Sequence, residues 1–419
     1  MLLMVYYISI ISYQLIGRPV DMMDLISIQN ILLFVSLVCL LASGLHLLFS
    51  EEEIVLNQQV IFLIVVYLFA ALSIVWARSP ERVLSVLKFR ILSTTAFMIL
   101  FSTIKDRTQV KNWISFLIFL SIFSIFIISA MTFLYSPTGG ISIGYLRDFT
   151  FDSNINIHSI TLLITFPIAL HYIFHSNAVY KRFTGLMILT GGTAVIVLSG
   201  SRSPLIVLGI FICGLAVIDH TKIGWKISRY RASAVMLSSI LLAVSFLLVT
   251  PSLLGRLVDQ SAQELSYLIY GDPSKPGPVR SRIYIVVWNI ITQPEKALVG
   301  VGFNNFGVIY SEITGQNYYP HPHNPVFKFT TELGVIGFIC IILVILRPIL
   351  WFFRGVSIID DEFHKSEFTS IGWTYILLLS FGVFQPLLTR HQFYITSAII
   401  FSTYISVTTN QSYSDSSKQ

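Results

Sequence analysis

Long apolar stretches separated by short polar breaks run along the chain from residue 2 to about residue 408. A helix needs about 20 mainly apolar residues to cross the roughly 30 Å hydrocarbon layer of a bilayer. This length rule predicts an all-α polytopic membrane protein with about twelve transmembrane helices. Their expected ranges are 2–17, 25–49, 59–76, 82–104, 113–135, 157–176, 184–200, 203–219, 232–250, 325–346, 369–389 and 391–408.

The expected helices divide the chain into four parts. Residues 1–250 hold helices one to nine, residues 251–324 form a long loop, and residues 325–408 hold helices ten to twelve. The Ser-rich residues 409–419 predict a disordered cytoplasmic tail. Because long loops on a rigid scaffold often carry function, the loop is the first place to look for chemistry.

Two helices and a turn are expected inside this loop. Residues 255–271 predict a polar helix, and residues 281–293 predict an amphipathic helix near the membrane surface, because apolar residues recur there at helical spacing. Gly300, Gly302 and Gly307 predict a turn that leads into another short helix.

Composition excludes several classes of protein. The chain is 54% apolar and only 11% charged, against roughly 25% charge in soluble domains. The three cysteines, Cys39, Cys213 and Cys340, lie in apolar runs, which excludes a disulfide framework and a zinc site. The net charge of +6 does not indicate nucleic acid, because basic cytoplasmic loops produce such a balance in membrane proteins.

Basic residues predict the orientation in the membrane. With the N-terminus in the cytoplasm, thirteen Lys and Arg residues fall inside and six fall in the short outside segments. Cytoplasmic loops carry the excess of positive charge in membrane proteins, so both termini are expected inside and the long loop outside.

His321 and His323 lie in the string PHPHNPVFKFTTELGVIG, residues 320–337, where the loop meets the tenth expected helix. The prolines prevent a continuous helix, so both histidines are expected on an extended turn just above the membrane. A histidine there can accept a proton near neutral pH. The alternative is that His323 only forms a hydrogen bond within the loop.

Arg202 closes the string LSGSRSPL between two apolar runs, at the outer end of an expected hairpin. Its guanidinium group stays charged and matches the geometry of a phosphate. Arg280 and Arg282 begin the amphipathic helix, where the N-terminal amide groups add positive potential for an anion. The alternatives are an arginine that reaches toward lipid headgroups at 202 and solvated surface charges at 280 and 282.

Lys88 and Arg90 lie inside the fourth expected helix. Charges within a transmembrane helix are unfavourable, so they are candidates for function, and a lipid-linked phosphate near the outer leaflet would suit them. The alternative is that they reach toward the interface or pair with Asp148 or Asp152. Glu332, in the tenth expected helix near His323, is a further intramembrane charge.

Several motifs are absent from the sequence. It contains no GxxxxGK[ST], HExxH, CxxC or GxSxG string, and the acids of the long loop form no DxD-like pair that could hold a metal-bound nucleotide sugar. We therefore expect no metal and no cofactor.

These residues resemble the bacterial O-antigen ligase and polymerase superfamily of membrane glycosyltransferases. The ligase signature is a His followed by Asn, Ser or Gln, nine residues, Gly, two residues, and Gly, Thr or Tyr. His323, Asn324, Gly334 and Gly337 match every element of it. SGSRSP with Arg202 is similar to the family's outer arginine, and the strings FDSNINIHS and LVGVGFNNFG also look like those of the family.

A second arginine in the family opens a helix and is followed six residues later by a tryptophan. Arg282 and Trp288 have this spacing, whereas Arg280 does not, although it lies only two residues away.

The resemblance implies a GT-C-like membrane enzyme of the bacterial inner membrane with its active site in the periplasm. It would transfer a glycan from undecaprenyl pyrophosphate to a sugar hydroxyl of the lipid A core, in lipopolysaccharide biosynthesis, with inversion and without a metal. His323 would be the general base, and Arg202 with Arg282 or Arg280 would hold the pyrophosphate. Lys88, Arg90, His321 and Asn324 would complete the substrate-binding set.

Two other functions remain open. A polymerase of the same superfamily would use a second lipid-linked glycan as the acceptor. A transporter of lipid-linked oligosaccharides would also need many spans and basic residues, but the long outside loop and the absence of paired broken helices argue against it.

Overall fold

A computed structural model of the protein describes residues 57–104, 107–134, 151–198, 202–217, 251–271, 278–316, 320–322, 324–359, 362–383 and 391–416, together with single positions between 35 and 49 and between 234 and 241. Every regular element in this part of the chain is helical. The all-α fold expected from the sequence is confirmed there.

The helices form two groups. The bundle group comprises α3 (Gln58–Leu72) with the short η1 (Ser73–Val75), α4 (Pro80–Thr103), α5 (Arg107–Leu134), α7 (Phe151–His175), α8 (Val179–Leu198), α9 (Arg202–Val217), α15 (Pro325–Ile358), α16 (Glu362–Gly382) and α17 (His391–Ser416). The loop group comprises α11 (Pro251–Tyr270), α12 (Val279–Ile291), α13 (Pro294–Val299) and α14 (Phe306–Thr314).

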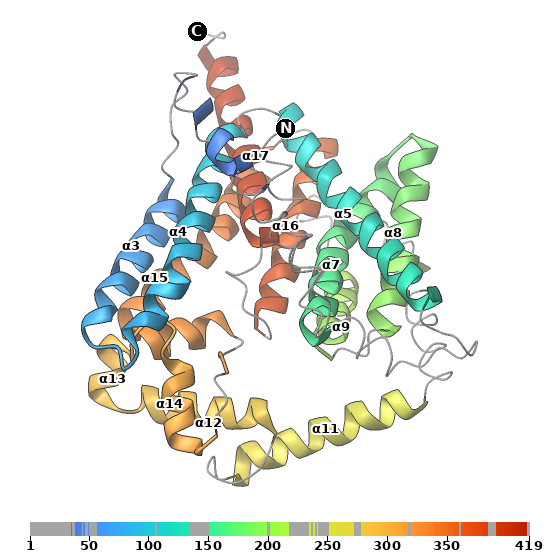
Figure 1. Ribbon diagram of the computed structural model, residues 1–419. Coiled ribbons are helices and arrows are strands. Elements are labelled where there is room, and N and C mark those ends of the chain that lie inside the picture. Colours follow the sequence, from blue (N-terminus) through green and yellow to red (C-terminus); the bar gives the residue numbers. More distant parts are fainter. Residues whose placement is uncertain are drawn as a thin grey trace.

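The bundle is organised around two neighbourhoods of helices. α15 packs against α3, α16 and α17, while α7 packs against α5, α8 and α16. Figure 1 shows the loop helices at one end of the bundle, with α11 running across it and the C-terminal end of α17 at the opposite end. α13 packs on α15, which connects the loop helices to the bundle.

Five helical segments in the described residues are long and apolar enough to cross a membrane: Gln58–Val75, Pro80–Thr103, Thr108–Ser129, His158–His175 and Pro325–Ile358. They correspond to the third, fourth, fifth, sixth and tenth spans expected from the sequence. The structure therefore supports the conclusion from composition that this is a membrane protein.

The other expected spans are not established in the same way. The spans expected at 184–200, 203–219, 369–389 and 391–408 coincide with α8, α9, α16 and α17, which are helical but do not meet the same length and hydropathy requirement. Charged residues in the first turns of α8 and the polar C-terminal part of α17 lower their hydropathy. The span expected at 2–17 lies outside the described residues, and those expected at 25–49 and 232–250 lie mostly outside them.

Three local expectations differ from the structure. α15 continues past residue 346 to Ile358, and α17 continues to Ser416 through most of the tail expected to be disordered. α17 contains neither Pro nor Gly, so nothing in its sequence stops the helical hydrogen bonding. Gly307 is the second residue of α14 and not part of the preceding turn.

Side chains from neighbouring helices satisfy the backbone where prolines interrupt the bundle. Pro348 in α15 has no N–H for the carbonyl of Val344, and Gln59 Nε2 of α3 donates to that oxygen at 2.9 Å. In α7, Pro167 leaves the carbonyl of Leu163 without its helical donor, and Thr374 Oγ1 of α16 donates to the carbonyl of the next residue, Ile164, at 2.7 Å. Such bonds matter inside a membrane because no water is available to make them.

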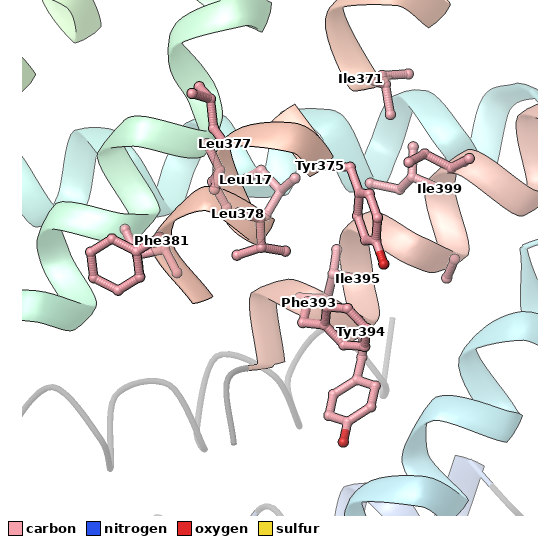
Figure 2. Packing of buried hydrophobic residues seen from close by; sticks show 14 of the residues in the cluster. Leu117, Ile371, Tyr375, Leu377, Leu378, Phe381, Phe393, Tyr394, Ile395 and Ile399 are labelled. Atoms are coloured by element: carbon pink, nitrogen blue, oxygen red, sulfur yellow. The ribbon is translucent and has the colours of Figure 1, made fainter. Parts of the chain in front are cut away.

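The core between α5, α16 and α17 is aromatic and aliphatic. Figure 2 shows Tyr375 of α16 close to Phe393 and Ile399 of α17, with Leu117 of α5 on the other side. The rings of Tyr375 and Phe393 are 5.8 Å apart, and the Tyr375 hydroxyl donates to the carbonyl of Ile345 at 3.0 Å. The hydroxyl thus contributes a polar contact to α15 from within an apolar layer.

α15 is broken at Gly334, where φ is 64° and ψ is −154°. This conformation is essentially restricted to glycine. The carbonyls of Thr331 and Glu332, which precede the break, accept hydrogen bonds from Val301 N and Gly302 N, both at 2.9 Å. The backbone after α13 therefore docks on the break in α15.

The docking leaves no room for a side chain at two of the glycines. A Cβ at Gly334 would lie 2.2 Å from the carbonyl oxygen of Leu298, and one at Gly300 would lie 2.3 Å from the carbonyl of Glu332. Gly300 also has a positive φ of 76°. We call residues 300–305 the glycine turn.

We predict that Gly334→Ala lowers the free energy of unfolding by about 3 kcal/mol or more, because it combines backbone strain with a clash against backbone atoms. Gly209→Ala is the matched control, because Gly209 lies within α9 and an added Cβ there meets open space. Thermal unfolding of both variants in detergent measures the difference, and equal midpoints would show that the break at Gly334 is not needed for stability.

Candidate functional site

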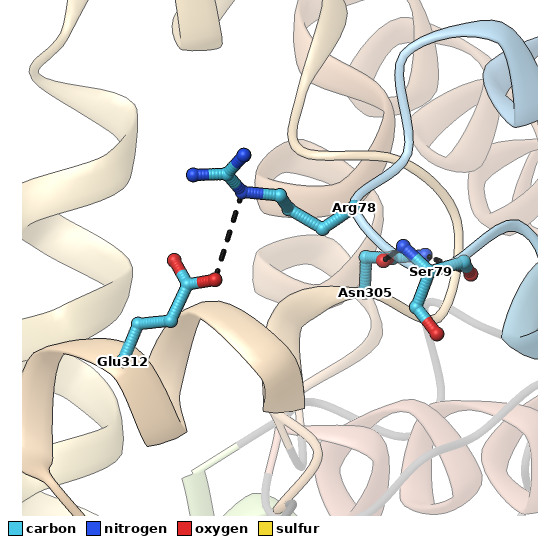
Figure 3. A network of polar contacts seen from close by, with 4 residues as sticks. All are labelled: Arg78, Ser79, Asn305 and Glu312. Carbon is cyan, nitrogen blue, oxygen red and sulfur yellow. Dashed lines mark hydrogen bonds and ion pairs between the residues drawn. The ribbon is translucent and has the colours of Figure 1, made fainter.

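The glycine turn is held between α15 and the connection from α3 to α4. Phe303 N donates to Ser73 Oγ at 2.9 Å, and Asn304 Nδ2 donates to the carbonyl of Arg82 at 3.2 Å. Asn305 accepts from Ser79 N at 2.7 Å and donates to the Ser79 carbonyl at 3.2 Å (Figure 3). These bonds fix the position of α14, which begins at the next residue.

An ion pair lies at the edge of this contact. Arg78 Nε is 3.6 Å from Glu312 Oε1, and Figure 3 shows the two side chains approaching each other from the α3–α4 connection and α14. Their side chains are 69% and 49% exposed. Because solvent screens such pairs, this one contributes little to stability, and the buried amide contacts of Asn305 hold the turn.

Asn324 has a clear structural role at the start of α15. It is the N-cap residue, and its side-chain oxygen accepts from Val326 N at 2.8 Å and from Phe327 N at 3.3 Å. Pro325 follows as the first helical residue, a position that suits its missing N–H. The Asn of the signature therefore fixes where the helix begins.

The two candidate histidines precede this cap. His321 is exposed and outside regular structure, as the flanking prolines predict. His323 lies outside the described residues, so its expected role stays a prediction. Its position in the chain places it directly before Asn324.

Arg282 and Arg280 differ in their surroundings, although they lie two residues apart on α12. Arg282 is only 5% exposed, and its Nε has no hydrogen-bond partner among the described residues. Arg280 is half-buried. A buried guanidinium group with an unused donor can bind an anion, which distinguishes Arg282 from its neighbour.

α12 contacts both the preceding loop helix and α15. Ser281 Oγ donates to the carbonyl of Glu264 in α11 at 3.0 Å. The ring of Tyr284 packs edge-on against Phe327 in the first turn of α15, with centroids 5.7 Å apart. The structure thus brings the helix of Arg282 next to the end of α15 that Asn324 caps.

Burial raises the pKa of Tyr284 above its ordinary value of 10.0; nearby Arg280 lowers it and Glu264 raises it further. The net shift is upward, so Tyr284 carries its proton at neutral pH and can act as a hydrogen-bond donor. This phenol lies near Arg280, and sequence reasoning did not single it out.

Lys88 and Arg90 lie in different environments on α4. Lys88 is exposed, whereas Arg90 is half-buried and acts electrostatically on both Lys328 and Glu332 of α15. Lys328 is 7% exposed, with Nζ 5.6 Å from the ring centroid of Phe303, and Glu332 is fully buried. We call Arg90, Lys328 and Glu332 the buried charge cluster.

Sequence reasoning noted Glu332 but missed Lys328. The two residues are four positions apart in a helix, a spacing that places them on one face. That spacing was the available signal. Their burial depends on the glycine turn that packs on them, about 30 residues earlier in the chain.

Arg202 is the first residue of α9, as expected for an arginine at the end of a hairpin. α9 packs against α7, α8 and α16, whereas α12 packs against α11, α13, α14 and α15. The two arginines of the candidate site thus come from different parts of the molecule.

The described residues contain no group of three His, Cys, Asp or Glu side chains that could hold a metal ion. The polar groups near α12 and α15 include guanidinium, ammonium, amide and phenol groups, together with the carboxylates of Glu264 and Glu332. Such groups suit an anionic ligand with hydroxyl groups nearby.

Comparison with known families identifies one domain. Residues 185–342 match the family model described as O-antigen ligase. The matched region includes Arg202, Arg282, the glycine turn and the signature residues through Gly337. A search of curated proteins finds no match. The resemblance to the O-antigen ligase superfamily drawn from the motifs is confirmed.

Proposed function

We propose that this membrane protein, which carries an O-antigen ligase domain over residues 185–342, transfers a glycan from undecaprenyl pyrophosphate to a sugar hydroxyl of the lipid A core. The transfer would take place at the periplasmic face of the bacterial inner membrane. The family match supports a ligase or polymerase of this superfamily, and the choice of donor and acceptor is our proposal.

The observation that carries the proposal is the state of Arg282. A guanidinium group that is 95% buried would normally have its donors satisfied, but Arg282 Nε has no partner among the described residues. A pyrophosphate oxygen would supply the acceptor and the charge that this group lacks. Arg202, at the start of α9, would hold the same pyrophosphate from the other side.

The proposed reaction needs no nucleotide. The bond between the sugar and the pyrophosphate supplies the energy, so the donor itself drives the transfer. His323 would take the proton from the acceptor hydroxyl as its oxygen attacks the anomeric carbon, with inversion of configuration. The bond to the pyrophosphate breaks at the same time, and Arg202 and Arg282 stabilise the charge that grows on the leaving group.

The remaining candidates would orient the substrates. Asn324 fixes the helix start next to His323, and His321 is exposed close by. Lys88 is exposed on α4, where it could contact a lipid-linked phosphate, and Arg280 lies beside Tyr284 at the start of α12. Because both substrates are held in one membrane by lipid anchors, the entropic barrier to their encounter is lowered.

Deleting the gene for this protein should remove all polymer from lipid A while lipid-linked polymer is retained. Gel banding of the surface polysaccharide measures the first quantity, and extraction of polyprenyl-linked glycan measures the second. A strain that instead attaches a single repeat unit to lipid A would show that the protein is the polymerase. Loss of banding with lipid-linked glycan held in the cytoplasmic leaflet would indicate a transporter.

Arg282→Lys should reduce transfer by about 100-fold, because lysine keeps the charge but loses the planar, forked geometry that binds phosphate. Arg280→Lys is the matched control, since Arg280 is half-buried on the same helix, and we expect a loss below about threefold. Transfer is measured with purified protein in nanodiscs. Similar losses in the two variants would assign no special role to the buried arginine.

His323→Ala should abolish transfer but leave donor binding intact, whereas His321→Ala should have a mild effect. In the wild type the rate should rise with pH through the range near 6.5 and then level off, because a general base must first lose its own proton. Donor binding and turnover are measured separately. Near-normal turnover in His323→Ala, or loss of donor binding equal to that of Arg282→Lys, would contradict the role of a base.

A further inference from the structure

Glu332 is a buried carboxylate that the proposed mechanism does not use. It lies in the segment of α15 before the break at Gly334, is fully buried, and neither carboxylate oxygen makes a hydrogen bond among the described residues. Burying a carboxylate in this way is strongly unfavourable unless nearby positive charge or dipoles compensate it. Groups around Glu332 must therefore compensate its charge.

Two cations and two amides surround this carboxylate. Lys328, one helical turn earlier, and Arg90 of α4 both act on it electrostatically. The backbone N–H groups of Asn304 and Phe306 also face it, at a geometry looser than a hydrogen bond. These amides belong to the glycine turn and the first residue of α14.

The same residue also holds the glycine turn through its main chain. The carbonyl of Glu332 accepts from Gly302 N at 2.9 Å, and a Cβ at Gly300 would clash with that carbonyl. Lys328 adds a contact on the same face, because its ammonium group lies 5.6 Å from the ring centroid of Phe303 in the turn. The main chain of Glu332 and the side chain of Lys328 thus both contact the glycine turn.

The contact between the glycine turn and Glu332 positions the segment of α15 that precedes the break at Gly334. That segment begins after the N-cap residue Asn324 and carries Phe327. The ring of Phe327 packs on Tyr284 of α12, which lies two residues after Arg282. A shift of the glycine turn against Glu332 would therefore move the loop helices relative to the start of α15. A misplacement of about 1 Å can slow a reaction by about 100-fold.

The cluster is poorly suited to hold the pyrophosphate itself. A fully buried carboxylate beside the two cations would repel a bound phosphate, and the Lys328 side chain is itself only 7% exposed. The charges of the cluster are better matched to one another and to the glycine turn than to a ligand.

We propose that Glu332 is a positioning residue for the transfer reaction, and that with Lys328 it holds the glycine turn so that the helix of Arg282 and the start of α15 meet in the productive arrangement. The inference rests on the proposed function, because it assigns the reacting groups to those two helices.

The test compares Glu332→Gln, Lys328→Met and the double variant. Glutamine keeps the shape and an acceptor oxygen but removes the charge, which leaves Lys328 as an uncompensated buried cation. We expect each single variant to lower kcat by about 100-fold while KM for the donor changes less than about threefold. Removing both charges should recover at least about tenfold of the kcat lost in either single variant, because coupled residues are not additive.

Glu312→Gln is the matched control, because Glu312 is an exposed carboxylate on α14 that forms a solvent-screened pair with Arg78. It should leave kcat unchanged. Hydrogen exchange of the Asn304 and Phe306 amides should be faster in Glu332→Gln than in the wild type and unchanged in Glu312→Gln. Hydrogen exchange is measured without the glycan donor, so it tests the buried charge cluster independently of transfer. If the wild type does not use a polyprenyl-pyrophosphate glycan, that result refutes the proposed function and not the role of the cluster.

Three outcomes would overturn the inference: additive losses in the double variant, a change confined to KM, or unchanged exchange of the two amides in Glu332→Gln. Size-exclusion chromatography identifies the folded fraction of each variant. If Glu332→Gln alone does not fold, the double variant is compared with Lys328→Met in both assays. A higher kcat and slower exchange in the double variant then support the inference, and equal or worse values refute it.

Discussion

The break in α15 at Gly334 is the constraint on which the arrangement of the candidate site depends. A continuous helix would use the carbonyls of Thr331 and Glu332 internally, whereas the break leaves them to the amides of Val301 and Gly302. In a protein whose helices are long and apolar enough to cross a membrane, such carbonyls must find partners within the protein. The glycine turn provides them and so fastens the loop helices to the bundle.

The same contact brings together groups that are far apart in the chain. Ser73, Ser79 and Arg82 of the α3–α4 region bind the glycine turn from one side, and α15 binds it from the other. α12 then packs next to the first turn of α15. The glycine turn consequently helps to position both the buried Arg282 and Asn324, the N-cap residue of α15.

Much of this could be predicted from the sequence, and the limits have physical reasons. Helical length and apolar periodicity revealed α3, α4, α5, α7 and α15, and spacing to Trp288 selected Arg282, which the structure shows to be the more buried arginine. Local pattern could not reveal the burial of Lys328 and Glu332, because a turn about 30 residues earlier in the chain covers them. It also could not tell that Arg90 faces α15 while Lys88 is exposed, since both lie in one apolar run.

The glycine turn is attached to α15 through the backbone, so the surface of the loop can change between related proteins without changing this attachment. The hydrogen bonds between the turn and α15 join main-chain atoms on both sides, so they are indifferent to most side chains outside the glycines. The exposed faces of α11 and α12, which include Leu265, Tyr270 and Trp288, can change without altering this attachment. Related proteins could therefore differ in the loop surface while the main-chain contacts that hold the loop to the bundle stay the same.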